Sequence, residues 1–61
     1  MYKKFSELLQ KHNVTAYKVS KDTGITQATL SDWKHGKSTP KVDKLLKIAD
    51  YFGVDVRYFL D

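Results

Sequence analysis

Residues 24–36 read GITQATLSDWKHG, a short segment bounded by two glycines. Thr26 is a residue type that caps helix N-termini, and Gly36 is the type that commonly follows the end of a helix. We therefore expect a helix over residues 27–34. A helix of this length spans about 12 Å.

The two faces of this expected helix differ in character. Leu30 and Trp33 are three positions apart, so they share one face, which we expect to pack in the core. A tryptophan can also stack on bases in single-strand binders, but its spacing from Leu30 favours the core. The opposite face presents small or polar side chains, at Gln27, Ala28, Ser31 and Asp32.

A second short helix is expected just before this one. Thr15 is a good N-cap, and Gly24 can close the helix over residues 16–23. The three-residue turn Gly24-Ile25-Thr26 then joins the two helices. Two short helices with such a turn, over about residues 15–34, predict a helix-turn-helix. Its second helix fits a major groove about 12 Å wide, where outward side chains can bond to base edges.

The N-terminal segment predicts an amphipathic helix from Tyr2 to His12, with Asn13 as its stop. Its apolar stripe consists of Phe5, Leu8 and Leu9.

The C-terminal half predicts two more helices. We expect Thr39 to cap the first, with Pro40 at its first helical position and Gly53 just past its end. Asp55 is expected to cap the last, short helix. The apolar residues of the two helices are Val42, Leu45, Leu46, Ile48, Ala49, Phe52, Val56, Phe59 and Leu60. Because no stretch alternates as a strand would, the sequence predicts an all-α, compact five-helix domain.

The composition limits the possible partners and chemistry. The chain has 61 residues, one small domain, with 11 Lys+Arg, 7 Asp+Glu and no cysteine. The net charge of +4 favours nucleic acid or another anionic surface as partner. Five lysines are concentrated at the end of the central helix and just after it: Lys34, Lys37, Lys41, Lys44 and Lys47. We expect the first three to approach phosphates and the last two to form a solvated face.

The sequence lacks the signals that are usual in other classes of protein. The two histidines are not spaced as zinc ligands, and the sequence has no cysteine-histidine pair, glycine-rich phosphate loop or paired carboxylates. We expect no enzymatic activity, cofactor, metal site or small-molecule ligand. No signal peptide or run of about 20 apolar residues is present. A cytoplasmic location is the expectation.

The segments TAYKVSKDTGITQATLSDWKHGKSTP and LLKIADYFGVDVRYFL resemble the Cro and lambda-repressor (XRE-type) helix-turn-helix family of phage and bacterial regulators. The resemblance extends from about Phe5 to Leu60. Two positions depart from the family's pattern. Ala16 stands where glutamine is common, and Ala28 stands where polar base-reading side chains are common.

The resemblance implies a role for each matching position. The base-reading residues it implies are Gln27, Ala28 and Asp32, with Thr26 and Ser31 beside them. Phosphate-binding positions are implied at the start of the preceding helix, Ala16 and Tyr17, at Thr29, and along the following loop, at Lys34, His35, Lys37, Ser38 and Lys41.

The resemblance further implies a transcriptional regulator, of phage or prophage repressor type, that binds a palindromic double-stranded operator as a homodimer. The alternative is an antitoxin-like protein-interaction module on the same fold. RNA binding has less support, because no exposed aromatic pair is predicted for stacking. Met1 indicates a natural start, whereas nothing marks Asp61 as a natural end, so a complete regulator and the N-terminal part of a longer one both stay open. A dimer contact could involve the C-terminal residues Tyr51, Arg57, Tyr58 and Phe59. The alternative is that Phe59 belongs to the core and the other three are plain surface.

Overall fold

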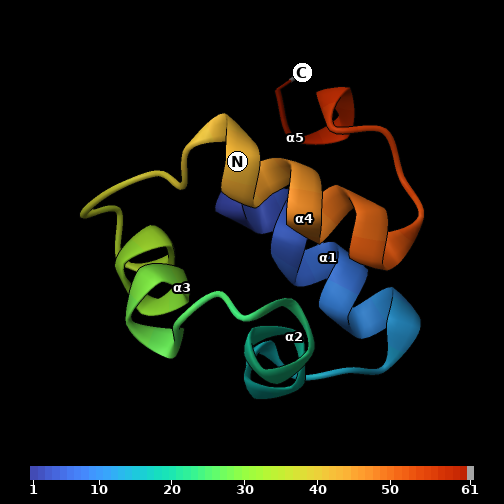
Figure 1. The fold of residues 1–61 in the computed structure, drawn as a ribbon, viewed down its shortest axis with the longest axis horizontal. Coiled ribbons are helices and arrows are strands. Elements are labelled where there is room, and N and C mark those ends of the chain that lie inside the picture. Colours follow the sequence, from blue (N-terminus) through green and yellow to red (C-terminus); the bar gives the residue numbers. More distant parts are fainter. Residues whose placement is uncertain (61) are drawn as a thin grey trace.

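The computed structural model describes residues 1–60; Asp61 lies outside the described residues. Within residues 1–60 there are five helices and no strand, so the all-α prediction is confirmed. The helices are α1 (Tyr2–His12), α2 (Ala16–Thr23), α3 (Gln27–Lys34), α4 (Val42–Phe52) and α5 (Arg57–Leu60). In Figure 1, α1 and α4 overlap at the centre, with α2 and α3 along one side and α5 on the other. The helix α2 contacts both α3 and α4, and α5 contacts α1.

Most of the predicted helix ends are confirmed. α1 ends at Asn13, which adopts the left-handed conformation at φ 54°. Thr15 caps α2 by accepting a hydrogen bond from the backbone nitrogen of Lys18 at 3.1 Å. Gly53 ends α4 at φ 72°, a conformation that glycine adopts without steric cost.

The predicted start of α4 is wrong. The helix begins at Val42 with Lys41 as its N-cap, so Thr39 does not cap it and Pro40 precedes it. Pro40 is buried and followed by an extended residue, Lys41, at φ −70° and ψ 165°. Burial of the proline ring thus decides the position of the helix start over the local Thr-Pro signal. Asp43 in the first turn lies where the helix dipole favours a negative charge.

The last helix also starts later than its apolar pattern suggests. The backbone nitrogen of Arg57 donates to Asp55 Oδ1 at 2.9 Å, so the predicted capping role of Asp55 is confirmed. Val56 lies before the helix and is half-buried. The Arg57 guanidinium also bonds the Asp55 carboxylate, and these contacts lower the pKa of Asp55.

Trp33 lies at the centre of a single hydrophobic core. Its side chain is only 4% exposed, which confirms the prediction that it belongs to the core. Ring centroids of Phe5, Tyr2 and Phe59 lie 5.2, 5.5 and 6.0 Å from that of Trp33. The buried apolar residues are Phe5, Leu8, Val19, Ile25, Leu30, Trp33, Leu45, Ile48, Ala49, Phe52 and Phe59.

Three residues predicted for the apolar stripes are exposed. Val42, Leu46 and Leu60 keep 57%, 44% and 53% of their surface. On α4 the core face is narrower than the apolar pattern, because Leu45, Ile48, Ala49 and Phe52 already fill the space against the other helices. Val42 and Leu46 are four positions apart and so flank that face on one side.

A hydrogen bond between side chains ties α2 to α4. The Tyr51 hydroxyl donates to Asp22 Oδ2 at 2.7 Å, and Lys18 Nζ lies 3.4 Å from Asp22 Oδ1. The hydroxyl of Tyr51, followed by the charge of Lys18, holds the pKa of Asp22 below its usual value. Among the C-terminal residues considered for dimer contacts, Tyr51 is thus engaged within its own chain.

The Asp22 contact predicts an acid-dependent contribution to stability. A carboxylate whose folded pKa is lowered stabilises the protein above its unfolded pKa, near 3.8, and the contribution is lost as pH falls through the folded value. Tyr51→Phe should therefore lower the free energy of unfolding at neutral pH, with a difference that shrinks in acid. Urea unfolding from about pH 7 to pH 3 measures it. Tyr58→Phe is the control, and a difference that does not change with pH would contradict the assignment.

The central position of Trp33 predicts that its loss unfolds the domain. Truncation of a buried aromatic residue costs about 3–5 kcal/mol, which is comparable with the stability of a domain of this size. Trp33→Ala should therefore lose its helical far-ultraviolet circular dichroism at 25 °C. Leu46→Ala, which shortens an exposed side chain, should keep the native spectrum. A native spectrum for Trp33→Ala would refute the central role.

Candidate nucleic-acid interface

The turn between α2 and α3 is held by bonds from side chains to backbone. The Ser20 hydroxyl donates to the carbonyl oxygen of Ile25, and the Thr23 hydroxyl donates to that of Val19. The backbone nitrogen of Ile25 donates to Thr23 Oγ1 at 3.3 Å. Ile25 itself is 1% exposed, so the middle of the turn is anchored in the core. These bonds fix the direction in which α3 leaves α2.

Two threonines form the start of α3. Thr26 Oγ1 accepts a hydrogen bond from the backbone nitrogen of Thr29 at 3.2 Å, as its predicted capping role requires. The two hydroxyl oxygens also lie 2.9 Å apart. Thr26 is exposed and Thr29 half-buried. Both hydroxyls are therefore part of the N-terminal cap of α3, beside Gln27.

The two faces of α3 are divided as the sequence predicts. Leu30 and Trp33 are buried, whereas Gln27, Ala28 and Ser31 are exposed. Asp32 is half-buried, and its backbone carbonyl accepts from the backbone nitrogen of Lys37 at 2.8 Å. Of the residues predicted to contact bases, four therefore form one exposed surface, with Asp32 at its edge.

The loop after α3 carries the predicted phosphate-binding side chains. Its residues from His35 to Thr39 are exposed, and Gly36 turns the chain at φ 73°. The two ion pairs of the described chain, Lys18 with Asp22 and Arg57 with Asp55, are both elsewhere. Cationic side chains without an acidic partner therefore lie at the end of α3, at Lys34, and after it, at Lys37 and Lys41.

The start of α2 lies close to α3. Ala16 is half-buried, and Tyr17 is exposed, with Lys21 Nζ 5.8 Å from the centroid of its ring. The first backbone N–H groups of any α-helix have no partner within the helix and carry partial positive charge. At Ala16, where no polar side chain is available, these groups are what the helix offers to an anion.

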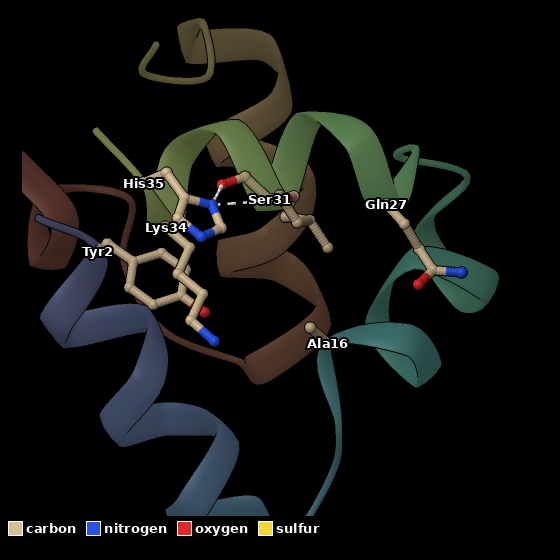
Figure 2. A pocket seen from close by; sticks show the side chains of 7 residues that line it. Tyr2, Ala16, Gln27, Ser31, Lys34 and His35 are labelled. Atoms are coloured by element: carbon tan, nitrogen blue, oxygen red, sulfur yellow. Dashed lines mark hydrogen bonds between the residues drawn. The ribbon is translucent and has the colours of Figure 1, made fainter. Parts of the chain in front are cut away.

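A hollow of about 240 Å³ separates α3 from the starts of α1 and α2. Leu30 contributes apolar surface, and the other lining residues are Tyr2, Ala16, Gln27, Ser31, Lys34 and His35. In Figure 2, Tyr2, Lys34 and His35 gather at one end, and Gln27 extends at the opposite end. This hollow is bordered by five of the predicted base-reading and phosphate-binding residues, Ala16, Gln27, Ser31, Lys34 and His35. Thr29, Ser38 and Lys41 line a separate hollow.

Tyr2 is the polar lining residue for which the sequence predicts no role in the site. Its position three residues before Phe5 places it on the apolar stripe of α1, where a tyrosine is expected to pack. Only the packing of α1 against Trp33 brings Tyr2 beside the end of α3.

The fold and this surface define a helix-turn-helix protein. A sequence model of a protein family described as helix-turn-helix matches residues 5–59, nearly the whole chain. The chain therefore belongs to the XRE-type, Cro-like helix-turn-helix family of DNA-binding regulators, as its sequence resemblance implied. A search of curated proteins found no significant match, and neither did a search of solved structures. No helix among the described residues is long and apolar enough to cross a membrane.

The turn geometry predicts a specific requirement at Gly24. This residue has φ 80°, and a Cβ added to it would meet no atom within 4 Å. The cost of Gly24→Ala is therefore conformational, about 1 kcal/mol. Thermal unfolding should show a lower midpoint for this variant, whereas Gly24→Asn should lose less, because asparagine tolerates the left-handed conformation. Equal losses for the two variants would indicate that packing, not φ, determines this position.

Proposed function

We propose that the protein is a transcriptional repressor that binds a palindromic operator as a homodimer. The observation that carries the proposal is the exposed row of Gln27, Ala28 and Ser31, on a helix whose opposite face is buried. Such a helix can enter the major groove without unfolding any part of the domain. A protein bound across a promoter excludes polymerase, which is the basis for proposing repression.

The side chains in the exposed row match the donors and acceptors of base edges. The Gln27 amide can bond to adenine N6 and N7 together, and the Ala28 methyl can contact the methyl group of thymine. Asp32, at the edge of the row, can accept from cytosine N4. Ser31 and Thr26 complete the proposed base-reading set.

The proposed phosphate contacts surround this row. They come from the start of α2, at Ala16 and Tyr17, and from Thr29, Lys34, His35, Lys37, Ser38 and Lys41. Contacts of this kind position the helix in the groove, while the base contacts supply specificity. The lysines among them also make affinity dependent on salt, because each neutralised phosphate releases counterions.

The size of the domain supports binding as a dimer. Its longest dimension is 25 Å, whereas successive major grooves on one side of the duplex are about 34 Å apart. One copy therefore places α3 in one groove only. Two copies related by a twofold axis would recognise an inverted repeat.

Selection from random duplexes tests this function directly. Bound duplexes recovered at about 150 mM salt should contain an inverted repeat with half-sites about one helical turn apart. Gln27→Ala should change the preferred base at one position of each half-site, with a discrimination loss of about 1–3 kcal/mol. Lys47→Ala, on the exposed side of α4, should preserve the motif. Recovery of duplexes without any shared motif would mean that the protein binds DNA only non-specifically, and would contradict the proposed function.

The lysines after α3 predict the salt dependence. Lys34→Ala should weaken binding to all sequences and reduce the slope of log affinity against log salt by about 0.9. Fluorescence anisotropy titrations between about 50 and 200 mM salt measure this slope. Lys47→Ala is again the matched control, and an equal change of slope in both variants would mean that the interface does not centre on α3.

A further inference from the structure

The end of the hollow opposite Gln27 brings together side chains from two helices that are far apart in sequence. Tyr2 comes from the start of α1, and Lys34 and His35 come from the end of α3. Figure 2 shows their polar ends gathered at this side of the hollow. These side chains thus form a small polar niche beside the proposed base-reading row. One of them, Tyr2, lies outside the helix-turn-helix.

The Tyr2 ring packs against two other aromatic rings, and its hydroxyl is unused. The ring is half-buried and meets Trp33 edge-on, at 5.5 Å between centroids and 88° between planes. A second edge contact, with Phe5, has a centroid distance of 5.6 Å. Within residues 1–60 the Tyr2 hydroxyl makes no hydrogen bond to the protein. A fixed hydroxyl without a partner can donate to a ligand with little loss of side-chain entropy.

His35 presents one defined nitrogen to the same niche. Its Nδ1 lies 2.8 Å from the backbone carbonyl oxygen of Ser31. A carbonyl only accepts, so Nδ1 carries the hydrogen, and Nε2 of the neutral ring has a lone pair. In Figure 2 this second nitrogen points toward the side where Tyr2 and Lys34 lie. An anion can bond to Nε2 only when the ring is protonated, since then both nitrogens donate.

The dimensions and charge of the niche select one kind of ligand. The whole hollow measures about 240 Å³, below the roughly 300–1,000 Å³ of sites that enclose a small molecule. Its polar groups at this end are an ammonium and a hydroxyl, which donate to oxygen anions, and an imidazole whose Nε2 donates only when the ring is protonated. A single oxyanion, such as one phosphate group, satisfies both conditions.

We propose that Tyr2, Lys34 and protonated His35 together seat one phosphate of the DNA backbone. The inference rests on the proposed DNA-binding function and adds α1 to the contact surface. Because the seat lies at the opposite end of the hollow from Gln27, it sets how far α3 advances along the groove. Tyr2 thus positions the base-reading residues and contacts no base.

A scan with methylphosphonates tests the seat. Single phosphates of the selected duplex are replaced by neutral methylphosphonates, and affinity is measured for the unaltered protein and for Tyr2→Phe, which keeps the ring packing. Tyr2→Phe should bind the unmodified duplex about fivefold more weakly, as expected for one lost hydrogen bond. At one phosphate in each half-site the difference between the two proteins should disappear. Tyr58→Phe, on α5, should match the unaltered protein on every duplex.

The pH dependence tests the part played by His35. Histidine is the side-chain type that changes charge between about pH 5 and 8. Of the groups lining the hollow, the ionisable ones facing His35 are Tyr2 from α1 and Lys34 from α3, and α2 contributes Ala16 alone. Binding should be about fivefold tighter when His35 carries its second proton than when the ring is neutral, and His35→Gln should remove the pH dependence. His12→Gln, at the opposite end of α1, should retain it.

The outcomes separate the seat from the function on which it rests. If the unaltered protein selects no duplex, both the function and the seat fall. If it selects a duplex but Tyr2→Phe binds as tightly, or if its loss is the same at every modified phosphate, the seat alone falls. A pH dependence that persists in His35→Gln removes His35 from the seat. Thermal unfolding of each variant should match the unaltered protein, and a lowered midpoint in Tyr2→Phe would assign its effect to packing instead.

Discussion

The burial of Trp33 is the contact on which both the fold and the proposed DNA-binding surface depend. This side chain extends from the inner face of α3 and meets rings from α1 and α5. The helix that carries the exposed row is therefore fixed to the core by its own residue, together with Leu30. Beside it, Ile25 buries the turn, so α3 is held at its start and near its end. The rigidity of the proposed contact surface follows from these three anchors.

Much of this arrangement follows from signals that are local in sequence. The boundaries of α1, α2 and α3 depend on Asn13, Thr15, Gly24 and Thr26, whose preferences act within one turn of helix. The division of α3 into buried and exposed faces follows from helical periodicity alone. These are the features for which sequence and structure agree, and the base-reading and phosphate-binding assignments built on them are still predictions.

The differences arise where distant segments compete with local preference. Thr39 and Pro40 form a favourable start for a helix, but burial of the proline ring moves the start of α4 to Val42. The width of the buried face of α4 is set by the helices that pack against it. The apolar stripe in the sequence does not reveal this width. The bond between Asp22 and Tyr51 joins residues 29 positions apart. Tyr2 likewise reaches the end of α3 only through the packing of α1, so neither contact has a local signal.

The exposed row on α3 also has a consequence for how such a protein can diversify. Gln27 and Ala28 are exposed and take part in no side-chain bond among the described residues, while the stability of α3 resides in Leu30 and Trp33. Substitutions at these two positions therefore change the exposed side chains of α3 and leave its stability unchanged. With the proposed base-reading role, new operator preferences would arise one residue at a time, without passing through unfolded intermediates. The same separation makes the domain a suitable scaffold for libraries randomised at those two positions.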